Sequence, residues 1–461
     1  MPRTRAELAA TDMLQDTIAA ISTPIGESGL AVVRLSGADA LKIADACFRP
    51  VGATSKRPTE AQTHTVHYGK MQRAGKIIDE VLLTILRAPR TFTREDMVEV
   101  SCHGGVLPAK LVLDALLEAG ARLAEPGEFT KRAFLNGRID LAQAEAVADL
   151  IHSRTELALD AANEQLAGKL SRRIEDLRNQ MVQTLAHIEA HIDFPDEDIA
   201  PDTKEKLVQR LESGVTFMDE LLATANEGQI LRRGIRAAII GRPNAGKSSL
   251  LNQLLGHERA IVSPIPGTTR DTIEETANIR GIPVIFVDTA GIRESSDTIE
   301  AEGIRRSRES LARAELVLEV IDASESLSSD SRLAATNGKK HLVVLNKIDL
   351  PAKADVPTAH RISCTTGEGL ETLKDAIRDA VWSGKVGGEM NQVMINARHQ
   401  EALQRARRHT QHTIEALRSN QTLELAAMDL RIATNAIGEI VGKTTTEDIL
   451  DSVFSQFCIG K

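Results

Sequence analysis

The sequence predicts a multidomain α/β chain, in which a domain with a mainly parallel sheet is inserted into a helical domain and preceded by an α+β domain. Three observations predict this. At 461 residues, the chain is too long for a single hydrophobic core. The composition changes at Ile139 from short apolar runs to Ala, Leu, Glu, Gln and Arg. A glycine-rich loop follows an apolar run near the middle of the chain. The expected domains are residues 1–138, 139–232, 233–388 and 389–461.

The amino-terminal domain is expected to be α+β, because apolar runs at 31–35, 81–86 and 97–100 alternate with turns that contain Gly or Pro. The first residues carry Glu7 and Asp12 and no apolar core, so neither a secretory signal nor a transit peptide is expected. No apolar run approaches about eighteen residues, so we expect no membrane span. Cysteines are scattered singly, which argues against zinc and disulfides and favours a reducing cytoplasm; they are Cys47, Cys102, Cys364 and Cys458.

The helical domain is predicted from an apolar stripe at steps of three and four residues. The stripe consists of Leu166, Leu170, Ile174, Leu177, Met181, Leu185, Ile188 and Ile192. Pro195 and Pro201 are expected to end this helix, and helical composition resumes near Gln392. One helical domain that is split in sequence is the simplest arrangement, since an insertion whose ends lie close together is readily tolerated.

Residues 241–248 read GRPNAGKS and complete a phosphate-binding loop. The apolar run 237–240 predicts a buried strand before the loop, and a helix is expected from Ser249. The glycines allow backbone N–H groups to surround phosphates at the positive end of that helix. Lys247 is expected to contact the β- and γ-phosphates and Ser248 to bind Mg²⁺. The sequence therefore predicts binding of a nucleoside triphosphate.

Guanine is the predicted base. Residues 346–349 read NKID and follow the apolar run 342–345. Asp349 can accept hydrogen bonds from guanine N1–H and its exocyclic amine, whereas adenine would leave this carboxylate unsatisfied. Ser363 and Cys364 fit a further turn that contacts the base. Between these motifs, residues 288–291 read DTAG after another apolar run, which places Asp288 to bind Mg²⁺ through water and Gly291 to sense the γ-phosphate.

The hydrolytic residues cannot be those of Ras-type GTPases, in which a glutamine after this glycine orients water. Ile292 occupies that position here. Asn244 could ligate a monovalent cation, and the loop 263–271 could supply carbonyl groups to the same ion and Thr269 as a second Mg²⁺ ligand. Glu300 is a candidate for orienting water, although by position alone it also fits an ordinary solvated helix residue.

Beyond the nucleotide motifs, segments along the whole chain after its first fifteen or so residues resemble the tRNA-modification GTPase family MnmE, also called TrmE. In the central region these are GRPNAGKSSLLN (241–252), PGTTRD (266–271) and DTAGIRE (288–294). In the other regions they are DTIAA (16–20), VRLSG (33–37), HGG (103–105), PGEFTKRAFLN (126–136), DFPDE (193–197) and FCIGK (457–461).

The resemblance implies a Ras-like P-loop GTPase domain that depends on potassium and meets the same domain of a second subunit during hydrolysis. It implies potassium ligands at Asn244, Ser263, Ile265 and Thr268, magnesium ligands at Ser248 and Thr269, and a water-orienting role for Glu300. Ser263 stands where threonine is usual. The implied GTP contacts are Asn244, Ala245, Gly246, Lys247, Ser248, Ser249, Ser263, Pro264, Ile265, Pro266, Gly267, Thr268, Thr269, Asp288, Thr289, Ala290, Gly291, Asn346, Lys347, Asp349, Ser363 and Cys364.

The resemblance also implies that the amino-terminal domain dimerises and binds a tetrahydrofolate derivative, like folate-binding aminomethyltransferases. The implied folate contacts are Arg34, Glu99, Arg138 and Lys461, with Arg138 in place of the usual lysine. Cys458 is implied to take part in the modification chemistry, whereas from the sequence alone a buried structural cysteine or a prenylation box remains open. The implied partner is the FAD protein MnmG, which forms a heterotetramer or larger assembly that modifies the wobble uridine of certain tRNAs.

The net charge of −9 makes the chain as a whole a poor electrostatic match for nucleic acid. The basic residues near the carboxyl end are expected to form a solvated helix face rather than a surface that binds tRNA; these are Arg398, Arg405, Arg407 and Arg408. Two other functions remain open: a GTP-binding switch in ribosome assembly, which would not explain residues 1–138 or 457–461, and a stand-alone folate-dependent aminomethyltransferase, which would not explain the nucleotide motifs. The sequence does not indicate which tRNAs are modified, or whether glycine or ammonium donates the amine.

Overall fold

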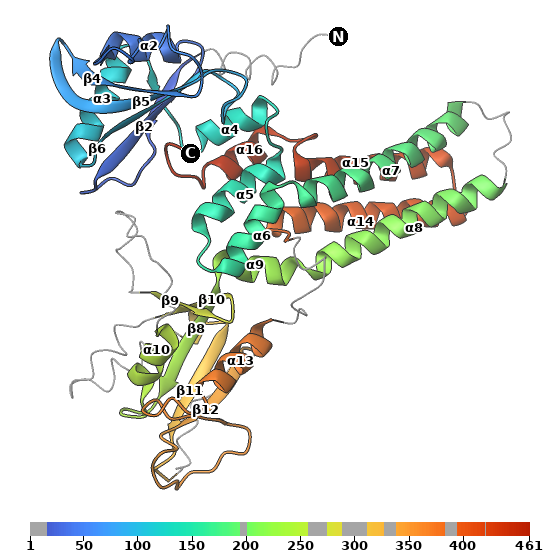
Figure 1. Cartoon of the computed structure of the whole chain (residues 1–461). Helices are drawn as coiled ribbons and strands as arrows, with labels where there is room; N and C mark the ends of the chain where they lie inside the picture. The colour runs from blue at the N-terminus through green and yellow to red at the C-terminus, as the bar shows by residue number, and fades with distance from the viewer. Residues whose placement is uncertain are drawn as a thin grey trace. The chain divides into compact units, whose positions relative to one another are not determined.

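The computed structural model describes residues 16–193, 201–256, 274–287, 311–326, 338–382, 394–419 and 421–461 (Figure 1). Of residues 201–203 it describes the backbone only. The chain divides into two compact units. The first consists of Met1–Ala148, Ser171–Glu175 and Asn435–Lys461, and the second of Asp149–Leu170 and Asp176–Thr434. The domain boundaries expected at residues 138, 232 and 388 remain predictions.

The first unit contains a seven-stranded sheet in the order β3-β4-β5-β6-β2-β1-β7. Neighbouring strands are antiparallel except β1 and β7, which are parallel. The strands are β1 (Ile18–Ile21), β2 (Leu30–Ser36), β3 (Phe48–Pro50), β4 (Thr65–Arg73), β5 (Lys76–Leu86), β6 (Met97–His103) and β7 (Arg122–Leu123). The apolar runs 31–35, 81–86 and 97–100 therefore lie in β2, β5 and β6, which are neighbours in one sheet.

The sheet of the first unit is buried on both faces near β1, because successive strand residues point to opposite faces. On one face Ala19 joins the core with α2 (Ala40–Cys47) and α3 (Val106–Glu118). On the other face Ile18 and Ala20 pack with Met97 and Phe129. The remaining helices of this unit are α4 (Glu128–Leu135), α16 (Glu447–Phe454) and most of α5 (Leu141–His152).

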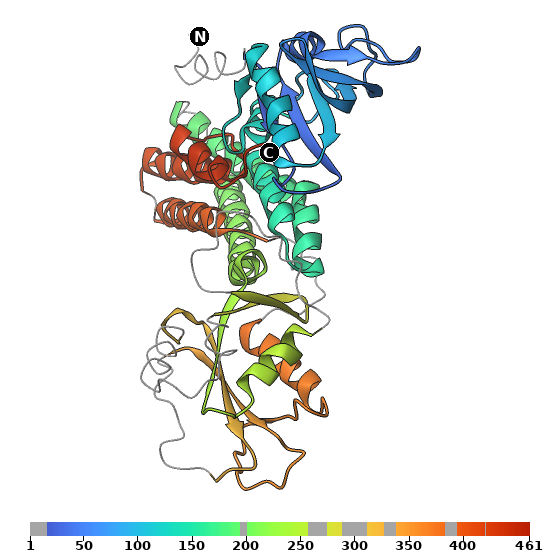
Figure 2. The same cartoon turned by 90° about the vertical axis from the view of Figure 1, so that its left-hand side faces the viewer.

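The second unit contains a six-stranded sheet in the order β13-β12-β11-β8-β10-β9. Its pairs are parallel except β9 with β10, so this sheet is mainly parallel. The strands are β8 (Ile235–Gly241), β9 (Glu275–Ile279), β10 (Ile282–Phe286), β11 (Leu316–Asp322), β12 (Lys340–Asn346) and β13 (His360–Arg361). One face packs against α10 (Lys247–Leu255) and α13 (Leu370–Val381), which lie on the same side of the sheet (Figure 2).

Two short helices of the second unit share the core of this sheet. They are α6 (Glu156–Leu166) and α9 (Ala225–Arg233), which contribute Ala158, Ala161, Ile230 and Leu231. The predicted apolar stripe is divided between two helices, because Gly168 adopts a φ of 80° and α7 (Lys169–Asp193) begins after it. The helix α8 (Pro201–Ala223) starts at the proline expected to interrupt the pattern, since proline is favoured at the first helical position.

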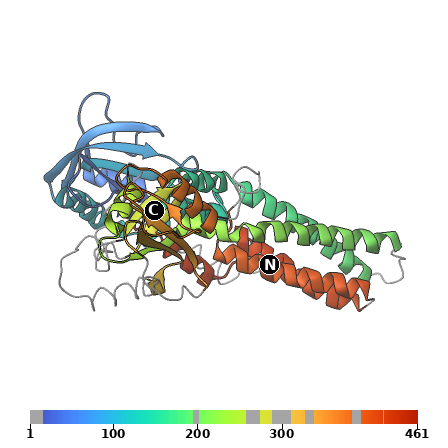
Figure 3. The ribbon, with the colours of Figure 1, turned by 90° about the horizontal axis from the view of Figure 1, so that it is seen from below.

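Four long helices lie side by side, as Figures 1 and 3 show: α7, α8, α14 (Ala397–Arg418) and α15 (Leu423–Val441). Ion pairs join them in the second unit. Arg407 and Arg418 of α14 bind Asp219 and Glu212 of α8, and Arg431 of α15 binds Glu189 of α7. Within the described ranges, none of the helices has the length and hydropathy that a membrane crossing requires.

Candidate nucleotide and folate sites

The phosphate loop joins the end of β8 to the start of α10. Asn244 and Gly246 have positive φ angles of 62° and 96°, so the chain turns sharply before the helix. Gly246 is the residue that precedes α10, and its carbonyl accepts from the N–H of Leu250 at 2.9 Å. The first N–H groups of a helix lack helical partners and favour an anion. This loop therefore has the backbone shape that a phosphate group requires.

The side chain of Lys247 lies along the phosphate loop. Its Nζ donates to the carbonyl oxygens of Gly241 at 3.0 Å and Arg242 at 2.8 Å. Burial lowers the pKa of this amine, because the charged form loses solvation. A phosphate beside the loop would restore a full counter-charge. Ser248 is half-buried on the first turn of α10, and Ser249 next to it is exposed.

Asn346 connects the phosphate loop to the predicted base-binding turn. It ends β12 and is 2% exposed. Its Nδ2 donates to the carbonyl oxygen of Ala245 at 3.0 Å, and its Oδ1 accepts from the N–H of Cys364 at 3.2 Å. A Cβ atom on Gly246 would lie 2.1 Å from Asn346 Nδ2, so only glycine leaves room for this amide. One side chain thus fixes both ends of the nucleotide site.

Asp349 is held by the buried Ser363. The Ser363 hydroxyl donates to Asp349 Oδ1 at 2.6 Å and accepts from the N–H groups of Thr365 and Thr366 at 3.3 and 3.1 Å. Asp349 itself is exposed. Burial, together with the charge of Asp349, raises the pKa of the Cys364 thiol to about 11. This thiol therefore stays neutral near pH 7 and places no second negative charge beside the carboxylate.

Asp322 positions Lys347 and was not among the residues that the sequence motifs indicated. It ends β11 and lies opposite Asn346 in the register of β11 and β12. Its Oδ2 contacts Lys347 Nζ at 2.6 Å, and Ser324 donates to Oδ1. Although burial opposes ionisation, the hydrogen bond from Lys347 keeps the pKa of Asp322 below its usual value. The sequence did contain a signal for Asp322. This acidic residue follows the apolar run of β11, just as Asn346 follows the apolar run of β12.

Twelve of the predicted site residues lie outside the described residues. They are Ser263, Pro264, Ile265, Pro266, Gly267, Thr268, Thr269, Asp288, Thr289, Ala290, Gly291 and Glu300. They include all of the predicted potassium ligands except Asn244, one magnesium ligand, and the residue expected to orient water. Their roles remain predictions.

In the first unit, Arg34 and Glu99 face each other across β2 and β6. Arg34 Nε and Nη2 contact the same Glu99 oxygen, Oε1, at 2.9 and 2.8 Å. The Arg34 guanidinium also lies 5.7 Å from the centre of the Phe129 ring. The two side chains are 18% and 28% exposed, so they remain accessible to a ligand. A guanidinium beside a carboxylate can recognise both an anion and a hydrogen-bond donor.

The last residues of the chain dock beside this pair. The Gly460 carbonyl accepts from Ser22 Oγ at 3.2 Å and Arg34 Nη1 at 3.5 Å. The Phe129 N–H donates to the Lys461 carbonyl at 3.2 Å, and Ile459 forms a bridge with Pro126. Gly460 has a φ of 94°, and a Cβ there would lie 2.4 Å from the Ile21 carbonyl oxygen. The structure thus brings Arg34, Glu99 and Lys461 together.

Two other predicted residues of this site are placed differently. Cys458 is exposed, and its carbonyl accepts from the Gly127 N–H at 3.4 Å. Arg138 donates from Nη1 to the Phe92 carbonyl at 3.0 Å and lies 4.9 Å from the centre of the Phe92 ring. Burial, and then the charge of Arg94, lowers its pKa. Phe92 and Phe129 pack in one cluster, so Arg34 and Arg138 lie over rings of the same cluster.

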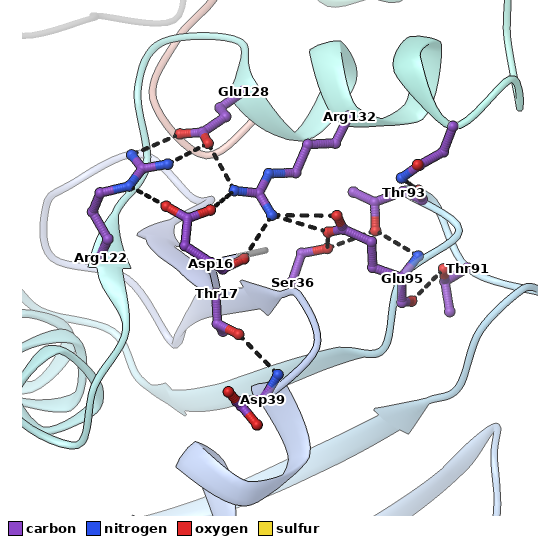
Figure 4. A network of polar contacts seen from close by, with 11 residues as sticks. Asp16, Thr17, Ser36, Asp39, Thr91, Thr93, Glu95, Arg122, Glu128 and Arg132 are labelled. Carbon is purple, nitrogen blue, oxygen red and sulfur yellow. Dashed lines mark hydrogen bonds and ion pairs between the residues drawn. The ribbon is translucent and has the colours of Figure 1, made fainter. Parts of the chain in front are cut away.

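A buried polar network fixes the helix α4 that holds the terminal residues (Figure 4). Arg132 is 2% exposed and binds Glu128 at 3.0 Å, Glu95 at 3.2 Å and Asp16. Arg122 binds Asp16 and Glu128, each at 2.6 Å. Although burial opposes ionisation of Glu128, Arg122 and Arg132 hold its pKa below the usual value. The 126–136 motif therefore supplies structural ion pairs as well as the Phe129 N–H.

Comparisons with known proteins agree with these features. The family model described as "MnmE helical domain" matches residues 141–458, and the model described as "GTP-binding protein TrmE N-terminus" matches residues 17–138. A tRNA modification GTPase MnmE from Geobacillus thermodenitrificans is 46% identical over 461 residues, which cover 97% of this chain and 99% of the relative. One from Bacillus velezensis is 45% identical, with 97% and 100% covered.

Among solved structures, Aquifex aeolicus Era bound to GDP·AlF4⁻ is 28% identical, with 38% of this chain and 66% of that chain covered and a TM-score of 0.25. This TM-score is too low to establish a shared fold. The curated relatives, in contrast, extend over nearly the full chain at high identity. The chain belongs to the MnmE family of tRNA modification GTPases.

Proposed function

We propose that this chain is a potassium-dependent GTPase that acts with the FAD protein MnmG. Together they add a carboxymethylaminomethyl or aminomethyl group to carbon 5 of the wobble uridine of certain tRNAs, with a one-carbon unit from a tetrahydrofolate derivative. The proposal is carried by the presence of two features in one chain. Asp349, the residue proposed to bind guanine, is held by Ser363, and the terminal segment is docked against Arg34.

GTP is recognised at both ends. Asp349 accepts the two donors of guanine, and Asn346 keeps the base-binding turn and the phosphate loop at a fixed separation. The loop N–H groups and Lys247 bind the phosphates. An adenine base would leave the Asp349 carboxylate without its hydrogen bonds, which disfavours ATP by a large factor. The neutral Cys364 thiol avoids repulsion at this end of the site.

The residues of the phosphate loop fit the two metal ions proposed for hydrolysis. Ser248, on the first turn of α10, offers a hydroxyl oxygen, which suits Mg²⁺ together with Thr269. Asn244 is exposed at the turn of the loop, where its amide oxygen suits K⁺ together with Ser263, Ile265 and Thr268. The potassium ion would supply positive charge where Ras-type enzymes use an arginine. Glu300 orients water, and the GTPase parts of two subunits meet during the reaction.

Arg34, Glu99 and Lys461 hold the folate, with Arg138 at the same aromatic cluster. The guanidinium groups and the terminal lysine attract the carboxylates of the folate glutamate tail, even though the chain carries a net negative charge. Cys458 exposes its thiol beside this segment and takes part in the modification. Through these contacts, the amino-terminal domain presents the one-carbon unit in a homodimer that binds MnmG.

The hairpin β9–β10 offers a path from GTP to the helices. It stands between residues 257–273 and 288–310, which carry Thr269 and Asp288. Arg154, just before α6, donates to Thr276 of β9 at 2.7 Å. Gly281 at the tip of the hairpin packs against Leu157 of α6. A change at the γ-phosphate that moves the hairpin therefore acts on α6, and GTP shifts the population of two arrangements.

Mass spectrometry of wobble nucleosides from cells that lack this protein tests the proposal. The modified uridine disappears in the deletion strain and returns with the natural chain. It does not return with Lys247→Ala, which impairs the GTP site, or with Glu99→Gln, which impairs the folate site. Lys42→Ala, which removes an exposed pair with Asp39, serves as the control and restores the modification. A normal wobble uridine in the deletion strain contradicts the proposal.

Exchange of potassium for sodium tests the cation. Hydrolysis of GTP by the purified full-length protein slows strongly in sodium, while GTP affinity, measured by equilibrium binding, changes little, because the ion acts chiefly on the transition state. Asn244→Ala removes the difference between the two salts. Equal rates of the natural protein in both salts would remove potassium from the proposal and leave the GTP site intact.

A further inference from the structure

Two histidines and an aspartate converge between α14 and α15. The ligand atoms of His409, His412 and Asp429 all lie within 4.8 Å of one another. His409 Nδ1 is 2.7 Å from Asp429 Oδ1, and His412 Nδ1 is 3.8 Å from the same oxygen. None of these residues contributes to the functions proposed above.

An ordinary hydrogen bond accounts for only part of this arrangement. The contact of His409 with Asp429 has hydrogen-bond length, but that of His412 is too long to be one. Nevertheless, the Nδ1 atoms of both rings lie beside a single carboxylate oxygen. The rings meet edge to face, with centres 5.7 Å apart and an interplanar angle of 78°. Two imidazole nitrogens therefore lie within 3.8 Å of one carboxylate oxygen.

The helices place these groups close together and leave them accessible. His409 and His412 are three residues apart, so they lie on one face of α14. Thr413 Oγ1 contacts the Ala426 carbonyl of α15 at 3.4 Å, which shows that the helices pack closely beside the cluster. The side chains of His409, His412 and Asp429 are 23%, 51% and 13% exposed. An ion can reach them from solvent without disturbing the core.

Three arginines of these helices form ion pairs with other helices. Arg407 and Arg418 of α14 form their ion pairs with α8. Arg431 of α15, two residues after Asp429, forms its ion pair with α7. Asp429 Oδ1 lies 2.7 Å from His409 Nδ1 and 3.8 Å from His412 Nδ1, and its carboxylate provides the negative charge that a cation site needs.

We propose that His409, His412 and Asp429 bind one divalent transition-metal ion of the Zn²⁺ class and that this ion fastens α14 to α15. Imidazole and carboxylate groups are ordinary zinc ligands, and three protein ligands leave a fourth position for water. Ligand atoms around a tetrahedral zinc ion with bonds of about 2.0–2.1 Å lie roughly 3.3 Å apart. The three ligand atoms, which lie within 4.8 Å of one another, would close to this spacing around the ion.

Titration of the full-length, tag-free and chelator-treated protein with Co²⁺ tests the site, with Mg²⁺ in excess to occupy oxygen-rich sites. We expect one Co²⁺ ion per chain, detected by its visible absorption and displaced by Zn²⁺. His409→Gln, His412→Gln and Asp429→Asn each weaken Co²⁺ binding by more than roughly 100-fold. Removal of a residue that only hydrogen-bonds a metal ligand already lowers metal affinity by about 10- to 100-fold, and removal of a ligand itself lowers it further. His152→Gln, which changes an exposed histidine of α5, leaves the affinity unchanged.

The effect on the fold provides a second readout. Zn²⁺ raises the thermal midpoint of the natural protein and of His152→Gln, but not that of His412→Gln. Because His412 is half exposed, its replacement keeps the fold, so this variant decides the outcome even if the other two misfold. Absence of stoichiometric Co²⁺ binding by the natural protein, or unchanged binding by His412→Gln, overturns the proposal.

Discussion

The nucleotide site of the second unit is assembled from loops at the ends of parallel strands, whereas the candidate folate site of the first unit is assembled from antiparallel strands, one helix and the end of the chain. In the nucleotide site, the Asn346 side chain joins the two functional loops. In the folate site, Arg34, Phe129 and Lys461 meet only because the whole sheet and α4 are in place. The nucleotide site therefore depends on local hydrogen bonds, and the candidate folate site depends on the stability of the whole first unit.

Arg132→Met provides the largest expected effect and separates the two regions. Loss of this buried arginine removes the cation that pairs with Glu95 and leaves Arg122 as the remaining cation beside Glu128 and Asp16, at a cost of about 3–5 kcal/mol. Hydrogen exchange of the first unit should accelerate, and tetrahydrofolate binding should be lost. Trp382, the single tryptophan, lies in the core of the second unit, so its fluorescence should keep the same unfolding midpoint. A lower Trp382 unfolding midpoint in Arg132→Met would show that the second unit also depends on Arg132, and would contradict the expected separation of the two regions.

Asn346→Ala tests whether local hydrogen bonds control the nucleotide site. The change removes the bonds to Ala245 and Cys364 in a buried place, at a cost of about 1–3 kcal/mol. The affinity for GDP, measured by calorimetry, should fall roughly ten- to hundredfold, while tetrahydrofolate binding stays the same. Gln253→Ala removes an exposed bond to the Cys364 carbonyl and should change GDP affinity much less. An unchanged GDP affinity in Asn346→Ala would show that the phosphate loop and the base-binding turn keep their conformations without the Asn346 side chain.

Acid should weaken the first unit through its carboxylates. The pKa values of Glu128 and Asp16 in the folded protein lie below their ordinary values of 4.5 and 3.8. Each group therefore stabilises the folded state fully above its ordinary pKa, and this contribution is lost as the pH falls through the lower, folded-state pKa. Protection of the first unit against hydrogen exchange, taken relative to the intrinsic exchange rate at each pH, should decrease as the pH is lowered from about 5 to about 3. Glu128→Gln should reduce this pH dependence, and an unchanged dependence would remove Glu128 as its cause.

The smallest expected effect concerns the contact between Arg154 and Thr276. Arg154→Ala removes one hydrogen bond, worth about 1 kcal/mol. GTP hydrolysis should proceed at nearly the natural rate, whereas wobble-uridine modification in cells should decline, because the hairpin loses one of its contacts with the α6 region. Arg280→Ala, which breaks exposed pairs of the same hairpin with α13, is the matched control. Equal modification by both variants would exclude Arg154 from the path.

The difference between the two sites also explains what the sequence could predict. The nucleotide residues lie in short contiguous motifs whose backbone geometry is local, so the loop after β8 and the turn that holds Asp349 were recognisable. Asp322 was missed, because its role depends on the register of β11 and β12. In the first unit, the pairing of Arg34 with Glu99 and the docking of Gly460 join residues far apart in the sequence. Only the family resemblance connected them, and composition or periodicity could not.

The central claim is that guanine is read by Asp349 within a frame set by Ser363 and Asn346. The most direct measurement is the rate of hydrolysis of GTP and XTP by Asp349→Asn in potassium buffer. Asparagine offers one donor and one acceptor, which match xanthine in place of guanine. We predict that GTP turnover at low substrate falls at least about tenfold, as expected for a loss near 1.4 kcal/mol, and that XTP becomes the better substrate. Hydrolysis of GTP at the natural rate, with no gain for XTP, would contradict this claim.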